Sequence, residues 1–205
     1  MRLHHQVGVH NRRRWRTARA GAVNGTDLVR RRFDPSGPNQ LWAADVTQFR
    51  TGEGWLFLAA VLDLWSRRVI GWAAAPAVNA DLVGDALLMA FQRRRPDLRR
   101  GQRLVHHSDR GAPYTSLAFS ARLTELQLHQ SFSGVGSCYD NAAVESFFAT
   151  LKRELDWIHH HTTWSTRTEL RAALFDYIEA FYNTQRIQRR LHHQSPVEFE
   201  HHASA

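Results

Sequence analysis

The chain has 205 residues, of which 43% are hydrophobic, so it is long enough for one domain with a substantial core. Its single cysteine, Cys138, excludes an internal disulfide and a cysteine-rich zinc site. Apolar runs are too short for a membrane-spanning helix, and none follows the basic N-terminus as in a secretory signal. We therefore expect a soluble, intracellular protein.

The positive charge is concentrated at the N-terminus. Of the 27 Lys and Arg residues, nine lie in residues 1–33, where Asp27 is the only acid, so residues 34–205 are neutral overall. An arginine-rich segment favours a polyanion such as DNA, because neutralised phosphates release counterions. A solvated arm without a specific partner is the alternative. Since no helical or strand period precedes Pro35-Ser36-Gly37-Pro38, we predict a basic irregular arm and linker over residues 1–38.

Three strands are predicted after the linker, over residues 41–49, 55–62 and 68–75. The second is a near-continuous apolar run of the length typical of a buried strand. The turn residues Thr51-Gly52-Glu53-Gly54 favour a hairpin between the first two strands, so an antiparallel meander is the simplest arrangement. We interpret Asp63 as a turn residue that accepts backbone N–H groups, in preference to a metal ligand.

Helical and strand-like segments alternate in the next part of the chain. An apolar stripe with helical spacing begins behind a possible Asn79 cap and stops at Pro96. The arginines of residues 93–103 form a second basic patch, which either faces DNA or only solubilises a turn. The predicted elements that follow are a strand at 103–107, a helix at 115–126 and a strand at 128–132.

The next helix is expected to begin at Asp140 or Asn141, after a flexible glycine-containing loop at 133–137. Its apolar stripe consists of Val144, Phe148, Leu151 and Leu155. Glu145 is one position, about 100°, off this stripe, at the border between core and solvent. Lys152 falls on the same border two turns later.

The C-terminal part contains one strongly patterned helix. His159-His160-His161 is interpreted as a solvated helix end, because adjacent residues there do not converge on one metal. Thr166-Arg167-Thr168-Glu169 has the form of a capping box and begins an apolar stripe that extends to Tyr182. Ser195-Pro196 is predicted to end the domain. The expected boundaries are a folded body at 39–200 and a tail at 201–205.

This order of elements predicts an α/β fold in which helices flank a mixed sheet. Asp45 is expected in the first, central strand, Asp109 at the carboxyl end of the strand beside it, and Glu145 on the helix packed across that end. Three carboxylates are hard oxygen ligands for Mg²⁺ or Mn²⁺. Two such ions, roughly 3.5–4 Å apart, serve in-line displacement at phosphorus, so we expect phosphoryl transfer on nucleic acid. Any one of these acids alone is more often an ordinary surface or capping residue.

Short motifs occur in a fixed order through the same region. They are His107-Ser108-Asp109-Arg110-Gly111, Tyr114-Thr115-Ser116, Cys138-Tyr139-Asp140-Asn141-Ala142, Glu145-Ser146-Phe147-Phe148, Leu151-Lys152, Tyr182-Asn183 with Arg186, and Ser195-Pro196. This set resembles the orfB-type transposases of bacterial insertion sequences, which share the retroviral-integrase-like catalytic core. The resemblance extends from about Asn39 to Glu200.

The resemblance implies a ribonuclease-H-like fold with a five-stranded mixed sheet and an acidic (DDE) triad at Asp45, Asp109 and Glu145, the last two with 35 residues between them. It implies cleavage at an element's 3′ end and strand transfer, with two Mg²⁺ or Mn²⁺ ions. The implied partner is double-stranded DNA, at both element ends and target, bound by a homo-multimer. A bacterial, cytoplasmic, nucleoid-associated protein without a membrane segment is expected.

Contacts with DNA are expected from basic residues on both sides of the triad. Lys152 is similar to an integrase lysine that contacts terminal DNA, and a solvated helix lysine is the alternative. The other expected contacts are Arg12, Arg13, Arg14 and Arg186.

The sequence departs from the family in two places. Nothing in residues 1–40 resembles the helix-turn-helix region with which relatives begin. Gln188 stands where relatives usually have His, and His192 where they usually have Gly. A catalytically silent, truncated remnant that only binds DNA is therefore one alternative function. A cysteine hydrolase that uses Cys138, a histidine and Asn141 is a second, which requires a reactive thiolate.

Overall fold

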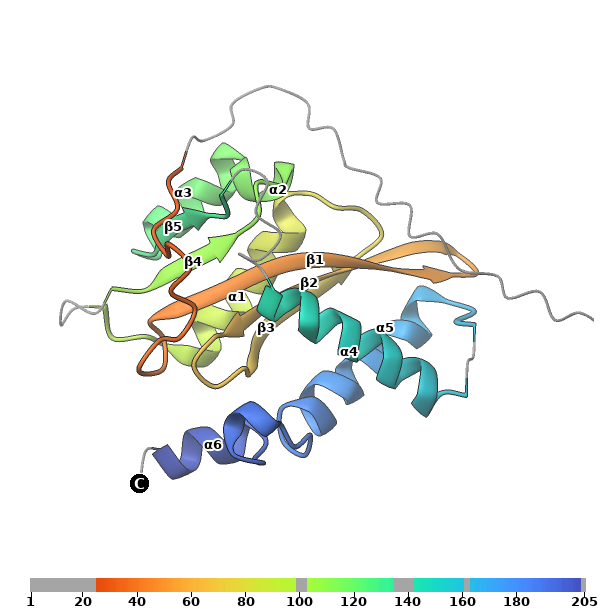
Figure 1. Cartoon of the computed structure of the whole chain (residues 1–205). Helices are drawn as coiled ribbons and strands as arrows, with labels where there is room; N and C mark the ends of the chain where they lie inside the picture. Colours follow the sequence, from red (N-terminus) through yellow and green to blue (C-terminus); the bar gives the residue numbers. More distant parts are fainter. Residues whose placement is uncertain (1–24, 99–102, 135–141, 161–162, 204–205) are drawn as a thin grey trace, which may run out of the picture.

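A computed structural model describes residues 25–98, 103–134, 142–160 and 163–203 (Figure 1). A five-stranded sheet lies at its centre, in the order β3-β2-β1-β4-β5. The strands are β1 (Leu41–Thr51), β2 (Gly54–Asp63), β3 (Val69–Ala75), β4 (Val105–Ser108) and β5 (His129–Phe132). β1, β2 and β3 pair antiparallel, whereas β4 runs parallel to both β1 and β5. The predicted mixed sheet is confirmed, with β1 as its central strand.

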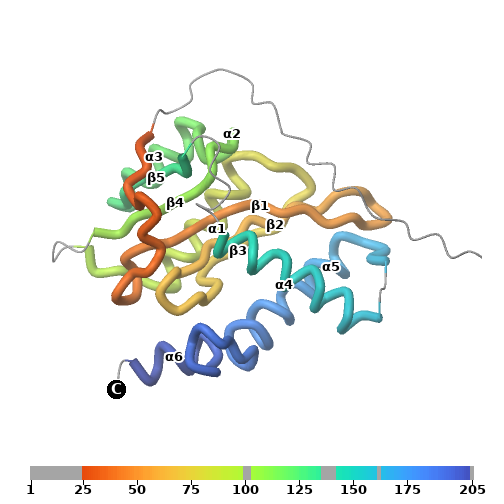
Figure 2. The backbone as a smooth tube through the Cα atoms, viewed as in Figure 1, coloured from red at the N-terminus to blue at the C-terminus, as the bar shows by residue number. Residues whose placement is uncertain are grey.

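Helices cover both faces of the sheet (Figures 1 and 2). One face is packed by α1 (Ala80–Arg94), α2 (Ala112–Thr115) and α3 (Leu117–Glu125). The other is packed by α4 (Ala142–Ile158), α5 (Arg167–Phe175) and a π-helix, η3 (Asp176–Tyr182). A 3₁₀ turn, η4 (Arg189–Leu191), and α6 (Pro196–Ala203) complete the chain.

The two cores follow from the alternation of side chains along each strand. In β1, Ala43 belongs to the α4-side core, whereas Trp42 and Ala44 belong to the α1-side core. α1 approaches β3 so closely that a Cβ on Gly71 would lie 2.2 Å from the carbonyl oxygen of Ala86. Only glycine fits at that crossing.

Two helix beginnings agree with the predicted capping residues. The side chain of Asn79 accepts a bond of 2.9 Å from the backbone N–H of Leu82. Thr166 accepts one of 3.1 Å from the N–H of Glu169, whose carboxylate accepts in turn from the N–H of Ser165 at 2.9 Å. These bonds satisfy N–H groups that have no partner within the helix.

Two predicted helices differ from the structure. The helix expected at 115–126 corresponds to α3, and the separate helix α2 precedes it, because Ser116 is extended and its hydroxyl accepts from the N–H of Phe119 at 3.2 Å to begin a new helix. The helix expected to run to Tyr182 changes to π winding at Asp176. Periodicity alone did not distinguish these variants, since both keep one buried face.

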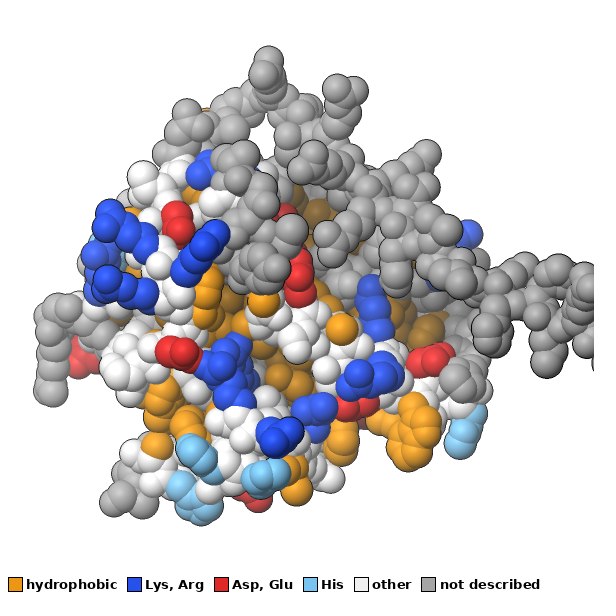
Figure 3. Space-filling view, in the orientation of Figure 1, with side chains coloured by type: hydrophobic (Ala, Val, Ile, Leu, Met, Phe, Trp, Pro, Cys, Tyr) orange, Lys and Arg blue, Asp and Glu red, His pale blue; other side chains and the backbone are white. Residues whose placement is uncertain are grey.

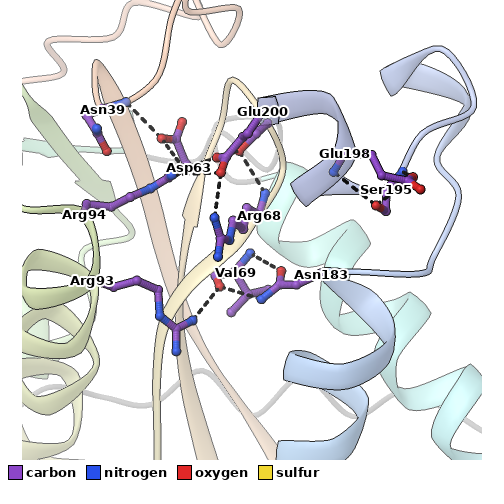
Figure 4. Close-up of polar contacts among 11 residues, drawn as sticks. Asn39, Asp63, Arg68, Val69, Arg93, Arg94, Asn183, Ser195, Glu198 and Glu200 are labelled. Atoms are coloured by element: carbon purple, nitrogen blue, oxygen red, sulfur yellow. Dashed lines mark hydrogen bonds and ion pairs between the residues drawn. The ribbon is translucent and has the colours of Figure 1, made fainter. Parts of the chain in front are cut away.

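The prediction that Ser195-Pro196 ends the domain was wrong. Pro196 begins α6, a position that suits its missing N–H and fixed φ. The carboxylate of Glu198 accepts from the backbone N–H of Ser195 at 2.8 Å and thereby caps the helix (Figure 4). The segment before Asn39 also packs on the body, with Val29 buried. Residues 1–24 of the predicted arm lie outside the described residues.

A buried ion-pair network attaches α6 to the sheet (Figure 4). Glu200 accepts from Ser66 Oγ at 2.6 Å, from Arg68 at 2.7 Å and from Arg94 at 2.9 Å. Arg94 also pairs with Asp63 at 3.0 Å. Asp63 accepts from the N–H groups of Asn39 and Trp65, which confirms its predicted turn role. Two charged residues of the second basic patch, Arg93 and Arg94, form ion pairs within the protein, and the two roles expected for the patch stay predictions.

The histidine run predicted as a solvated helix end begins just after α4. α4 ends at Ile158, and the ring of His159 packs against Trp164 with centroids 4.7 Å apart, while His160 is exposed. His161 lies outside the described residues.

Across the described ranges, none of the helices combines the length and apolarity that crossing a bilayer requires.

Candidate active site

Asp45 and Asp109 occupy equivalent places on two adjacent parallel strands. The register of β1 with β4 ends at the pair Ala44 and Ser108, so each aspartate is the next residue along its strand. Neighbouring strands lie about 4.8 Å apart, which sets the two carboxylates side by side. Asp109 was predicted at this place, the carboxyl end of β4.

The conformation of Asp109 depends on Gly111. The backbone N–H of Gly111 donates to Asp109 Oδ1 at 3.0 Å and closes a turn. A Cβ on Gly111 would lie 2.9 Å from the same oxygen, closer than ordinary contacts allow. The glycine of the Asp-Arg-Gly motif therefore leaves room for the carboxylate, and it also precedes α2.

Glu145 lies in the first turn of α4, one residue after the buried Val144. It is exposed, as is Lys152 two turns later, whereas the residues of the apolar stripe are buried. The Lys152 ammonium lies 5.3 Å from the ring centroid of Phe49, which belongs to β1. Phe49 and Asp45 point to the same face of β1. The border of α4 that carries Glu145 and Lys152 therefore lies along the part of β1 that carries Asp45.

The three acids interact electrostatically through Asp45. Burial raises the pKa of Asp45 to about 7, and the charges of Asp109 and Glu145 also raise it. A hydrogen bond of 2.7 Å from the N–H of Val46 acts in the opposite direction and lowers this pKa. Burial also raises the pKa of Asp109, which the N–H of Gly111 opposes. Like charges in a partly desolvated cluster disfavour ionisation, and a divalent cation would reverse that effect.

The donor chemistry fits a hard divalent cation, because each of the three side chains offers only carboxylate oxygens. In the described portion of the chain, however, no three His, Cys, Asp or Glu side chains are gathered closely enough to hold an ion. The acids are thus near enough to influence ionisation but are not drawn together around a common centre. Residues 135–141, immediately before α4, lie outside the described residues, together with Cys138, Asp140 and Asn141.

Tyr114 is a further residue of the site for which no role was predicted. Its hydroxyl is buried and has no hydrogen-bond partner among the residues described. Burial raises the pKa of Tyr114, and the charges of Asp45 and Asp109 raise it further. A protonated hydroxyl therefore lies within electrostatic reach of the two aspartates. The tyrosine was visible in the motif set, but its burial against the acids required the fold.

The predicted DNA contacts differ in their surroundings. Lys152 is exposed, and partial burial of the ammonium beside Phe49 lowers its pKa. Arg186 instead forms a two-pronged ion pair with Glu154, at 2.8 to 3.0 Å, which occupies its guanidinium within the protein. Arg12, Arg13 and Arg14 lie outside the described residues. Arg186 and Lys152 as DNA contacts stay predictions.

Comparison with known families identifies related sequences along most of the chain. Residues 35–138 match the family model "Integrase core domain", and residues 145–203 match a second model of the same description. Transposase InsF for insertion sequence IS3A, from Escherichia coli (strain K12), is 46% identical over 174 residues, 85% of this chain and 58% of the relative. A 31 kDa protein of insertion element IS600 from Shigella sonnei is 39% identical over 173 residues, 84% of this chain and 61% of the relative. The chain thus spans about three fifths of the length of these curated relatives.

Solved structures show the same fold at low sequence identity. A chain of the simian T-cell lymphotropic virus intasome superposes with a TM-score of 0.66 and 17% identity, over 90% of this chain and 60% of that one. The magnesium complex of the HTLV-2 integrase catalytic core gives 0.59 and 18%, over 80% and 97%. The catalytic domain of Mos1 mariner transposase gives 0.56 and 18%, over 70% and 71%. The ribonuclease-H-like fold of integrase and transposase cores is confirmed.

Proposed function

Because the chain belongs to the integrase core domain family, we propose that it is the catalytic core of a DNA transposase, which cleaves the 3′ end of an insertion sequence and joins it to target DNA. The observation that supports this most directly is the coupling of Asp45 to both Asp109 and Glu145. Three acids from distant parts of the sequence influence one ionisation at one edge of the sheet. The similarity to insertion-sequence transposases supports DNA as the substrate.

In this proposal Asp45, Asp109 and Glu145 hold two Mg²⁺ or Mn²⁺ ions. Ions held there would supply activation of the attacking oxygen and stabilisation of the leaving oxygen at phosphorus. The chain's own contribution is to hold the three carboxylates in a fixed spatial arrangement. β1 and β4 fix the two aspartates through their shared register, Gly111 orients Asp109, and α4 brings Glu145 to them.

Lys152 is proposed to bind a DNA phosphate beside this site. Its ammonium extends from the same border of α4 as Glu145 and is exposed. A basic side chain at that place positions the DNA backbone without reading its sequence. We keep Arg12, Arg13 and Arg14 as proposed contacts of the N-terminal arm, and assembly of several copies on DNA as a proposal supported by the intasome relative.

The catalytic core is assigned to residues 39–200 within a body that includes more of the chain. Residues 25–38 pack against it through Val29 and through a bond of 2.9 Å from the N–H of Leu28 to Ser131 Oγ. α6 continues to Ala203 and is attached through Glu200. A deletion at either of the predicted boundaries would therefore remove packed residues.

The test is substitution of one acid with a matched control. The chain is incubated with labelled duplex DNA and Mg²⁺, and strand cleavage and joining are measured, with metal binding followed by calorimetry. Asp109→Asn is expected to abolish both reactions and weaken Mg²⁺ binding, with folding intact. Asp85→Asn, an exposed acid on α1, is the control and keeps wild-type behaviour. Undiminished reaction by Asp109→Asn refutes the assignment, and DNA binding without reaction by the wild type favours the silent remnant.

A further inference from the structure

A pocket of about 390 Å³ lies on the α4 side of the sheet. It lies where the N-terminal segment, the beginning of α4 and the turn after η3 come together, a region where Figure 3 shows basic and apolar side chains interleaved. Its volume is within the roughly 300–1,000 Å³ typical of small-molecule sites. None of Asp45, Asp109 and Glu145 contributes to its walls.

In the described part of the chain, the charged residues that line the pocket are arginines. They are Arg67, Arg186 and Arg190, and none of the described Asp or Glu residues lines it. Arg186 and Arg190 are paired from outside the wall, by Glu154 and by Asp34 respectively. The pair with Asp34 is largely exposed on both sides and therefore weak. Since Glu154 neutralises Arg186, Arg67 and the weakly paired Arg190 supply the positive charge that favours an anion in this partly open space.

Two buried donors on the wall lack a well-aligned acceptor among the described residues. Arg67 Nε and Gln188 Nε2 are both inaccessible to water and make no hydrogen bond of ordinary geometry there, although the Gln188 side chain lies near enough to the Tyr182 hydroxyl to lower its pKa. Burial lowers the pKa of Arg67, which shows that its charge is desolvated without full compensation. Buried polar groups are normally paired, so unpaired donors beside a cavity indicate an absent acceptor. The hydroxyls of Ser146 and Thr150 on α4 line the same space.

The arrangement of donors and walls specifies the chemistry of the ligand. The donors come from the β2–β3 turn, from α4 and from the turn after η3, so they approach from different directions. A tetrahedral phosphate offers acceptor oxygens in several directions, whereas a carboxylate offers two in one plane. The rings of Phe33, Phe147 and Tyr182 complete the wall, and Phe33 is the one of the three that is not fully buried, because Phe147 and Tyr182 pack edge to face. An accessible aromatic ring stacks a base without regard to sequence.

We propose that this pocket binds a nucleotide, with its phosphate at Arg67 and Gln188 and its base against the aromatic wall. The site is separate from the acids, so it does not depend on the chemistry proposed for them. The bound nucleotide is either free in solution or the end of a DNA strand, and binding of a DNA end rests on the proposed function. The pocket thereby gives Gln188 a specific task.

The test uses the full chain, with binding measured by calorimetry and by NMR of the Gln188 side-chain amide. Deoxyadenosine monophosphate is expected to bind saturably at one site, inorganic phosphate more weakly and deoxyadenosine not measurably. Gln188→Glu keeps the side-chain shape but adds a carboxylate that pairs with the arginines, so nucleotide affinity is expected to fall at least tenfold. Arg67→Gln is expected to do the same. Arg189→Gln, an exposed neighbour that does not line the pocket, leaves the affinity unchanged.

Several outcomes would overturn the proposal. They are the absence of saturable nucleotide binding, equal binding of deoxyadenosine, or unchanged affinity in Gln188→Glu. Displacement of the nucleotide by a 5′-phosphorylated duplex, but not by the 5′-hydroxyl duplex, assigns the site to DNA ends. Binding without displacement assigns it to free nucleotides. Asp109→Asn should bind the nucleotide normally, so failure of the pocket and failure of the proposed catalysis are distinguishable.

Discussion

Replacing Asp45 with Asn should stabilise the folded protein at pH 8 when divalent ions are absent. The pKa of Asp45 is raised from 3.8 to about 7, so the folded state prefers the protonated carboxyl and resists ionisation. The stability of the protonated form is fully present below the unfolded pKa and is lost as pH rises from 3.8 through 7. The asparagine has no charge to desolvate and can keep the bond from the N–H of Val46.

The magnitude follows from the size of the shift. A change of about three pKa units corresponds to roughly 4 kcal/mol as an upper limit. The side chain is half-buried and its neighbours can move apart, so about 2 kcal/mol is a reasonable expectation. For a chain of this size that is a rise of roughly 4–8 °C in Tm.

The assay is urea and thermal unfolding of both proteins at pH 4 and pH 8, with EDTA and then with Mg²⁺. The asparagine variant should be more stable at pH 8, nearly equal at pH 4, and insensitive to Mg²⁺, which stabilises only the wild type. A variant that is less stable than the wild type at pH 8 without metal would refute the electrostatic reasoning. Equal Mg²⁺ stabilisation of both proteins would remove Asp45 from the metal site.

Three more substitutions test separate parts of the structure. Glu200→Gln leaves Arg94 partly unpaired in a buried network, so the free energy of unfolding should fall by about 2–3 kcal/mol in urea denaturation. Gly111→Ala places a methyl group against Asp109, and DNA cleavage should fall at least tenfold while the Tm changes little. Lys152→Gln should weaken DNA binding and reduce the slope of log affinity against log salt by about 1.

Each of these has a control or a contrary result. Glu125→Gln, which replaces an exposed acid on α3, should leave the free energy of unfolding unchanged. An equal loss of stability in Glu125→Gln and Glu200→Gln would show that the buried network does not stabilise the protein more than a surface acid does. Wild-type cleavage by Gly111→Ala would show that the turn at Asp109 tolerates a Cβ. An unchanged salt slope in Lys152→Gln would place that ammonium away from DNA phosphates.

Much of the fold was predictable from local pattern. Alternation and apolar runs predicted all five strands, because a strand between two helical layers must bury both faces. Asn79 and Thr166 indicated helix beginnings, since their oxygens satisfy N–H groups within the next three residues. The adjacency of Asp45 and Asp109 followed from one inferred parallel pairing.

The tertiary structure decided which charged groups are available for function. Glu200 pairs with Arg94 across 106 residues, and Arg186 with Glu154 across 32, and no local pattern predicts such partners. The same applies to the raised pKa of Asp45, which requires both burial and two distant charges.

The sequence by itself determined the strands and the helical faces, because these depend on periodicity. It also proposed the three acids, from their chemistry and from the family resemblance. The tertiary structure alone decided that α6 is part of the body and that Arg67 and Gln188 share a pocket without a well-aligned acceptor among the described residues. Burial and long-range pairing depend on how distant segments are folded together. The electrostatic energies at the site therefore depend on the fold, although the sequence supplies the residues that carry the charges.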